Sequence, residues 1–89
     1  MRSRATPRFW AAYRNLPREI KEAARKAYRL FREHARHPSL QFKKVHPLEP
    51  IYSARVTLGH RALGLLNGDE VAWFWIGTHA VYDRLLKDL

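Results

Sequence analysis

Hydrophobic residues recur with one period in the first half of the chain and with another in the second half. Near the start, Phe9, Trp10 and Tyr13 lie at i, i+1 and i+4, which is typical of a short helix beginning at Thr6-Pro7, where Thr can cap and Pro suits the first turn. From Pro17 to about Arg36, small and apolar residues recur every three or four positions and predict a second helix with one buried stripe. The stripe consists of Ile20, Ala23, Ala24, Ala27, Leu30, Phe31 and Ala35. Two consecutive helices with a short connection predict a helix hairpin.

The second half alternates with the period of two that strands show. Ser39 to Val45 predicts a short strand, and Ile51 to Thr57 a longer one. His60 to Leu66 and Glu70 to Gly77 flank Asn67-Gly68, a strong hairpin signal. A two-residue loop there would place Ala62 opposite Trp73 and Gly64 opposite Val71. From Thr78 the pattern is helical again, with Val81, Leu85 and Leu86 on one stripe.

Helices followed by strands indicate an α+β fold. We therefore expect one domain over residues 1–89, with the N-terminal helix hairpin packed on one face of a mainly antiparallel sheet of three or four strands, and a short C-terminal helix. The opposite face of the sheet is expected to form an open, concave surface.

Composition narrows the possible functions. The 89 residues carry 17 Lys and Arg against 8 Asp and Glu, a net charge of +9. Such an excess favours a polyanionic partner, namely RNA, DNA, an anionic membrane surface or an acidic protein. There are no cysteines, which excludes disulfides and thiolate metal sites. No apolar run approaches the roughly 20 residues that cross a membrane, so a cytoplasmic protein is expected.

Arginines within the predicted strands are the first candidates for a functional site. If the loop between the strands is Thr57-Leu58-Gly59, with Gly59 in the left-handed conformation, then Arg55 lies opposite Arg61 and both project from one face. Like charges in direct opposition are destabilising, so their retention favours an anion site. The alternative is that both are edge-strand cations that discourage aggregation.

Lys43 and Lys44 precede these strands in Leu-Gln-Phe-Lys-Lys-Val. One of them must face away from the Phe42 side and can reach the same surface as a phosphate-binding charge; the alternative is a solvated pair.

His79 is the candidate for proton transfer, because imidazole titrates near neutral pH. Tyr82, three residues later, is expected beside it on one helical turn, where it can position a phosphate or stack on a base. The alternative is that Tyr82 is a core residue and His79 caps the helix.

Other chemistry-bearing patterns are weaker. His34 and His37 have a spacing that suits a metal on a helix, but only two ligands are evident, so no metal or other cofactor is expected. His60 is expected on the face opposite to Arg61. Trp73 and Trp75 are interpreted as core residues rather than a base-stacking platform.

Three motifs in this order resemble the RelE/ParE superfamily of toxins from type II toxin–antitoxin pairs. They are Ser-Leu-x-Phe-Lys, Tyr-Ser-Ala-Arg-Val-x-x-Gly-His-Arg and Ile-Gly-Thr-His-x-x-Tyr, and the similarity covers about residues 7–87. Many members cleave mRNA in the ribosomal A site without a metal, by attack of the 2′-hydroxyl on the adjacent phosphate.

The resemblance implies site residues and partners. By position, Arg61 looks like the arginine that contacts the scissile phosphate, and Arg55 like the basic residue of the preceding strand. His79 takes the place of a terminal Arg or His, and Tyr82 that of a C-terminal aromatic residue. Lys43 or Lys44 would add to the phosphate grip, and an acidic antitoxin is the expected protein partner.

The chain also departs from the family pattern. Ser53 stands where ribonuclease members often carry a second lysine, and Pro7 interrupts the start, where many members have a strand. The ParE branch keeps the fold but inhibits DNA gyrase. The sequence therefore favours a ribosome-dependent mRNA endoribonuclease, with a gyrase inhibitor or a non-toxic nucleic-acid-binding module as alternatives.

Overall fold

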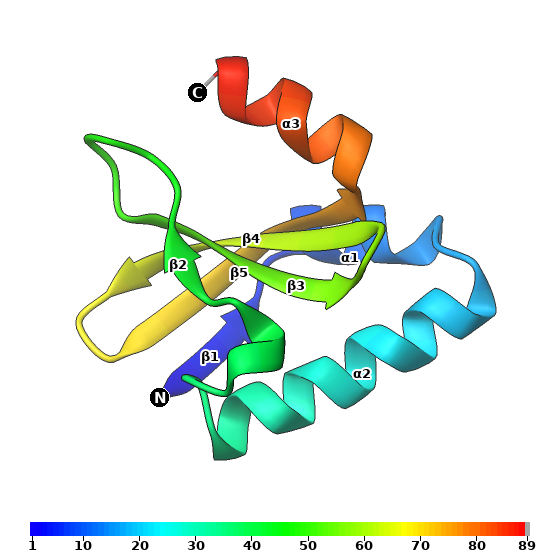
Figure 1. Ribbon diagram of the computed structural model, residues 1–89, viewed down its shortest axis with the longest axis horizontal. Helices are drawn as coiled ribbons and strands as arrows, with labels where there is room; N and C mark the ends of the chain where they lie inside the picture. Colours follow the sequence, from blue (N-terminus) through cyan, green and yellow to red (C-terminus); the bar gives the residue numbers. More distant parts are fainter. Residues whose placement is uncertain (89) are drawn as a thin grey trace.

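The computed structural model describes residues 1–88, which form three α-helices and a five-stranded sheet (Figure 1). In chain order the elements are β1 (Arg2–Ala5), α1 (Pro7–Arg14), α2 (Arg18–Glu33), a 3-10 turn η1 (Pro38–Leu40), β2 (Lys43–Lys44), β3 (Ile51–Thr57), β4 (His60–Asn67), β5 (Glu70–Thr78) and α3 (His79–Asp88). This order confirms the α+β fold, the helix hairpin and the C-terminal helix. None of the described helices is long and apolar enough to span a membrane.

The sheet has the order β1-β5-β4-β3-β2 and is mixed: three of its four strand pairings are antiparallel, and the pairing of β1 with β5 is parallel. The three- or four-stranded prediction was wrong because Arg2–Ala5 forms an additional edge strand, which pairs in parallel with β5. The sequence hid this strand because it is short and carries two arginines. Arg2 and Arg4 are instead neutralised by Asp69 and Glu70, at 3.0 and 3.2 Å.

Helix boundaries follow local chemistry. The Thr6 side chain accepts a hydrogen bond from the Phe9 N–H at 3.3 Å, which confirms the predicted start of α1. Helix α2 ends at Glu33 instead of Arg36, because His34 has an extended φ of -156°. The strand expected over Ser39–Val45 shrinks to Lys43–Lys44, since Ser39 lies in η1 and Gln41 adopts a left-handed φ of 46°.

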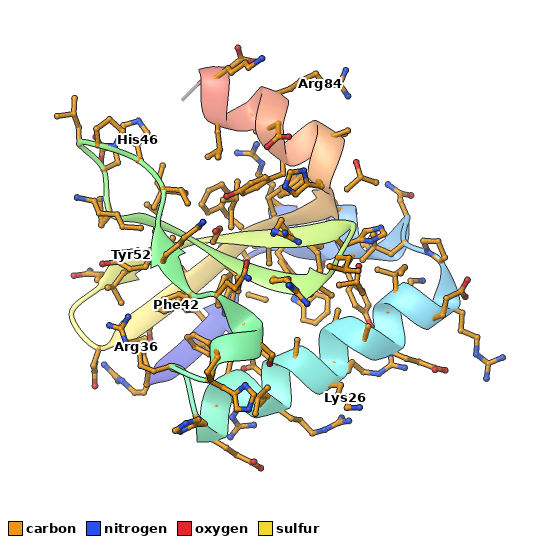
Figure 2. All side chains as sticks on the ribbon, viewed as in Figure 1. Lys26, Arg36, Phe42, His46, Tyr52 and Arg84 are labelled. Atoms are coloured by element: carbon orange, nitrogen blue, oxygen red, sulfur yellow. The ribbon has the colours of Figure 1, made fainter. Side chains whose placement is uncertain are left out.

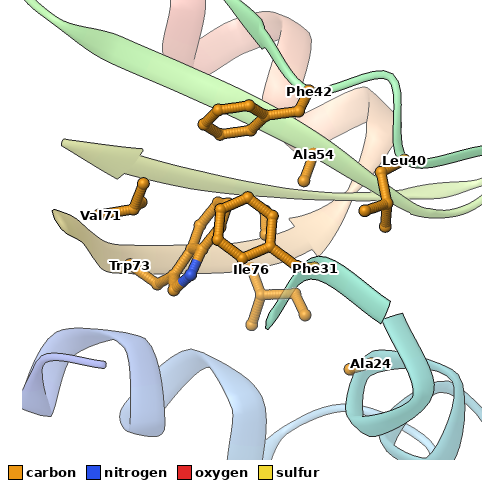
Figure 3. Close-up of a cluster of buried hydrophobic side chains, with 9 residues drawn as sticks. Ala24, Phe31, Leu40, Phe42, Ala54, Val71, Trp73 and Ile76 are labelled. Carbon is orange, nitrogen blue, oxygen red and sulfur yellow. The ribbon is translucent and has the colours of Figure 1, made fainter. Parts of the chain in front are cut away.

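Two hydrophobic cores lie on the two faces of the sheet. The larger one is enclosed by α1 and α2 and is built around Phe31, Phe42 and Trp73, whose rings meet edge to face (Figure 3). Trp73 belongs to this core, as predicted, and Trp75 packs against the smaller one. The smaller core joins Ile51, Leu63 and Tyr82 beneath α3. Helix α3 therefore covers part of the face that was expected to be open.

The β4–β5 hairpin has a different register from the predicted one. Its turn is Gly68-Asp69, with Gly68 at a φ of 63°, so Asn67 still belongs to β4 and pairs with Glu70. This register brings Gly64 opposite Trp73, and an irregularity between Leu63 and Gly64 then places Leu63 opposite Trp75. A small residue thus still lies opposite a large one, as expected, but the pair is Gly64 and Trp73.

Candidate functional site: a cationic end of the sheet

Arg55 and Arg61 are direct cross-strand partners on β3 and β4, as predicted. The route to this register was wrong, because Gly59 does not take a positive φ. A bulge between Arg55 and Thr57 shifts the strand instead, and Thr57 pairs with His60. The bulge, and not a three-residue loop, therefore brings Arg55 opposite Arg61.

The hydrogen-bond pattern also indicates how closely the two arginines approach. The Ile51 carbonyl accepts from the Val45 N–H at 2.8 Å, so the backbone polar groups of Ile51 point toward β2. Alternation along β3 gives Arg55 the same direction, so Arg55 and Arg61 form a non-hydrogen-bonded pair, the class with Cα atoms only about 4.5 Å apart. Both side chains are half-buried. Neither arginine forms a salt bridge with a carboxylate within residues 1–88.

The Arg61 guanidinium is held by the turn between β3 and β4. Its Nη1 donates to the carbonyl oxygens of Thr57 at 2.8 Å and His60 at 3.0 Å, with a longer contact to Leu58 at 3.4 Å. One amino group is thus used to order the turn, while Nε and Nη2 make no hydrogen bond to the described residues. Arg61 is therefore both a structural clamp and a positioned cation.

His79 stands at the junction of β5 and α3. Its backbone N–H donates to the Gly59 carbonyl at 2.8 Å, which ties the start of α3 to the β3–β4 turn. Arg61 lies opposite Gly77, two residues before His79, or about 7 Å along the strand. The structure therefore brings His79 and Arg61 to the same end of the sheet.

The imidazole of His79 is oriented by its own helix. Nδ1 lies 3.2 Å from an oxygen of Asp83, one turn later, and the ring is 5.6 Å from that of Tyr82. The His79 side chain is 47% exposed. Asp83 was missed by the sequence reasoning, although its i+4 spacing from His79 is a visible signal for such a pair.

Tyr82 is the predicted site residue that lies in the interior. It is 6% exposed and packs with Ile51 and Leu63. The Tyr82 ring is therefore packed in the core while it contacts the ring of His79. This location matches the alternative interpretation of Tyr82 as a core residue.

The two lysines of β2 lie on opposite faces. Lys43 pairs with Ser53 and Lys44 with Tyr52, and paired residues project from the same face. Tyr52 stacks on Phe42 on the α2 side, at a centroid distance of 4.9 Å (Figure 2). Lys43 therefore shares the face of Arg55 and Arg61, and Lys44 does not.

We define the cationic end as Lys43, Arg55, Arg61 and His79. These four side chains combine three positive charges with one imidazole, a side chain that can donate or accept a proton. Within residues 1–88, no group of three or more His, Asp or Glu side chains has a geometry that could hold a metal ion. The cationic end can bind a phosphate by charge and exchange a proton with it.

The fold and this cationic surface define a small basic α+β protein with a helix hairpin on one face of its sheet, and the sequence identifies its family. The chain belongs to the ParE-like toxin domain family, which it matches over residues 18–84. It is thus a toxin of the RelE/ParE type found in toxin–antitoxin pairs, as the sequence motifs predicted. No curated protein matches the chain significantly.

Solved structures share this fold at low sequence identity. YafQ from E. coli superposes with a TM-score of 0.72 at 11% identity, covering 92% of this chain and 98% of YafQ. A YoeB/ParE toxin from Agrobacterium tumefaciens gives 0.67 at 15% identity, covering 89% and 99%. A chain of the RelB–RelE antitoxin–toxin complex from Methanococcus jannaschii gives 0.65 at 20% identity, covering 90% and 95%. At these identities the likeness shows the fold alone.

Proposed function

We propose that this toxin is an mRNA endoribonuclease that acts on ribosome-bound message without a metal. The observation that carries the proposal is the direct opposition of Arg55 and Arg61 at the end of the sheet where His79 lies, without a neutralising carboxylate among residues 1–88. Two like charges held together in this way favour an anion between them. Lys43 extends the same cationic surface, so an RNA backbone is a suitable ligand.

The proposed reaction is attack of a ribose 2′-hydroxyl on the adjacent phosphorus. The new bond joins the 2′-oxygen to phosphorus, the bond from phosphorus to the 5′-oxygen breaks, and a 2′,3′-cyclic phosphate forms. Arg55 and Arg61 stabilise the extra negative charge of the phosphorane, and an imidazolium at His79 donates its proton to the departing 5′-oxygen. The proton of the 2′-hydroxyl passes to water. Tyr82 and Asp83 position the His79 ring.

Primer extension on mRNA in a translating extract tests this proposal. Wild-type protein should produce cleavage stops that disappear with His79→Ala and fall at least about tenfold with Arg61→Ala, in line with the loss of one transition-state donor. Lys44→Ala is the matched control for Lys43→Ala, because the two lysines lie on opposite faces. Cleavage that persists when His79→Ala and Arg61→Ala are combined would remove the site assignment.

A non-catalytic inhibitor of DNA gyrase is the second candidate. Two observations favour it: the match to the ParE-like family, and the use of the Arg61 guanidinium by the β3–β4 turn. Gyrase supercoiling in the presence of purified protein separates the two candidates. Inhibited gyrase with intact mRNA would select the second, and absence of toxicity on expression would leave a basic nucleic-acid-binding module.

An acidic antitoxin is the proposed protein partner, and the cytoplasm is the proposed location. The net charge of +9 favours an acidic partner. The related RelB–RelE complex from Methanococcus jannaschii and RelBE2 from Mycobacterium tuberculosis are both toxin–antitoxin complexes.

A further inference from the structure

A carboxylate lies beside one of the two ring nitrogens of His79. Asp83 follows one helical turn later on α3, and its Oδ2 is 3.2 Å from His79 Nδ1. Both side chains are about half exposed, at 47% for His79 and 54% for Asp83. The Nδ1 edge of the imidazole therefore faces a negative charge at the cationic end of the sheet.

Helix stability does not account for this pair. Charged pairs four residues apart stabilise a helix best when the acid comes first, because the macrodipole favours anions near the N-terminus and cations near the C-terminus. Helix α3 has the reverse order, with His79 as its first residue and Asp83 after it. The effect of Asp83 on the imidazole itself is therefore the better explanation.

The contact decides which ring nitrogen carries the proton when the imidazole is neutral. An ionised carboxylate has no proton to donate, so a bare Nδ1 would turn its lone pair toward the negative oxygen of Asp83. Repulsion between the two favours a proton on Nδ1 and leaves the lone pair on Nε2. We therefore expect neutral His79 as the Nδ1–H tautomer.

Two other histidines have the opposite environment at Nδ1. His37 Nδ1 accepts a hydrogen bond from the Ser39 N–H at 3.2 Å. His46 Nδ1 accepts from two backbone N–H groups of its own loop, at 3.1 and 2.8 Å. An accepting Nδ1 carries no proton, so both residues are Nε2–H tautomers when neutral. The same chain thus supplies an internal reference for His79.

The second ring nitrogen of His79 is left for a substrate. The backbone N–H of His79 is bonded to the Gly59 carbonyl, and the Tyr82 ring lies 5.6 Å from the imidazole. These contacts restrict the main chain and one side of the ring. Nε2 points away from Asp83 and forms no hydrogen bond within residues 1–88.

We propose that Asp83 is a positioning residue that holds His79 as the Nδ1–H tautomer, so that Nε2 gives its proton to the departing 5′-oxygen. The charged imidazole carries a proton on both nitrogens. Nδ1 keeps its proton against Asp83, the Nε2 proton becomes that of the 5′-hydroxyl, and the neutral Nδ1–H tautomer remains. This inference rests on the proposed ribonuclease function, but the tautomer can be measured without RNA.

NMR of the isotope-labelled full chain tests the tautomer. Long-range proton–nitrogen correlation spectra at about pH 8.5, where imidazoles are neutral, distinguish a protonated ring nitrogen from a bare one. We expect a protonated Nδ1 in His79 and a protonated Nε2 in His37 and His46. Asp83→Ala should remove the Nδ1–H preference of His79, and Asp83→Glu should keep it. An Nε2–H tautomer in wild-type His79, or a tautomer that Asp83→Ala leaves unchanged, would overturn the proposal.

Cleavage kinetics test the consequence for the reaction. Asp83→Ala should lower kcat about tenfold without raising KM, because the change impairs proton transfer and not RNA binding. Asp83→Glu should recover most of this loss. The matched control is Asp88→Ala, which removes a carboxylate of the same helix that forms no ion pair on the described part of the chain.

The control variant Asp88→Ala should keep kcat within about twofold of wild type. An equal loss with Asp88→Ala, or a higher KM at unchanged kcat with Asp83→Ala, would contradict the positioning role. Uncut mRNA together with the expected His79 tautomer would instead reject the ribonuclease proposal alone, so the two failures remain distinguishable.

Discussion

The backbone N–H of His79 is hydrogen-bonded at 2.8 Å to the carbonyl of Gly59, so the first residue of α3 is fastened to the β3–β4 turn. Arg61 is fastened to the same turn through its side chain. A single turn therefore positions both His79, the proposed proton-transfer group, and Arg61. Mutations in this turn should alter stability and function together, and the predictions below are designed to separate the two effects.

Arg61→Ala should lower the free energy of unfolding by about 1–3 kcal/mol, because the Thr57 and His60 carbonyls lose a charged donor. Arg55→Ala should leave it within about 0.5 kcal/mol of wild type or raise it, since it removes a like charge from the pair. Urea denaturation checks both values. A larger destabilisation by Arg55→Ala than by Arg61→Ala would contradict the assigned roles.

Two substitutions of Tyr82 distinguish a packing role of its ring from a chemical role of its hydroxyl. Tyr82→Ala should cost about 3–5 kcal/mol, because a buried ring is removed from the core with Ile51 and Leu63. Tyr82→Phe keeps the ring and should stay within about 1 kcal/mol. If the hydroxyl takes no part in the reaction, mRNA cleavage by Tyr82→Phe equals that of wild type; a loss of cleavage at unchanged thermal stability would assign it a chemical role.

Gly64 should tolerate no side chain. A Cβ atom there would lie 2.5 Å from Val71 Cγ1 and 2.9 Å from Trp73 Cε3. Gly64→Ala should therefore destabilise the fold by about 1–3 kcal/mol through overpacking. Gly59→Ala is the control, because a Cβ at Gly59 meets nothing within 4 Å. Equal melting temperatures for the two variants would show that the side chains of Val71 and Trp73 can shift to accommodate a methyl group at position 64.

The Arg2–Asp69 ion pair gives a pH-dependent contribution to stability. The hydrogen bond and charge of Arg2 lower the pKa of Asp69 below its usual value of 3.8 in the folded protein. The contribution is therefore complete above that value and is lost as the pH falls below it. Asp69→Asn should lower the melting temperature slightly at pH 7, and less at high salt because the pair is exposed.

The control for this pair is Asp88→Asn, which removes a carboxylate that forms no ion pair on the described part of the chain. The difference in melting temperature between wild type and Asp69→Asn should shrink as the pH is lowered from 5 to 3. A difference that stays constant over this interval would contradict the linkage to the Asp69 carboxylate.

Regular periodicity made most of the fold predictable. The stripe from Ile20 to Leu30 and the alternation in Ile51–Thr57 agree with the elements in the structure, because burial on one face imposes a strict spacing. The opposition of Arg55 and Arg61 was also predicted. The two bulges were not predicted, because no feature of the neighbouring sequence identifies Val56 or Phe74 as the extra residue in its strand.

Features that depend on residues far away in the sequence could not be predicted. Strand β1 exists because Glu70–Trp73 offers a free edge, and its two arginines are neutralised by carboxylates 66 and 67 positions away. The depth of Tyr82 was likewise left open by the sequence, because helical spacing places it beside His79 without showing that Ile51 and Leu63 close over its ring.

The parallel pairing of β1 with β5 has a consequence for synthesis. Residues 2–5 hydrogen-bond to a strand that ends at Thr78, so β1 cannot pair until the chain has been synthesised as far as β5. Such a distant pairing delays folding, because the intervening chain must be ordered first. A translating ribosome thus carries this basic chain with an incomplete sheet until β5 has emerged.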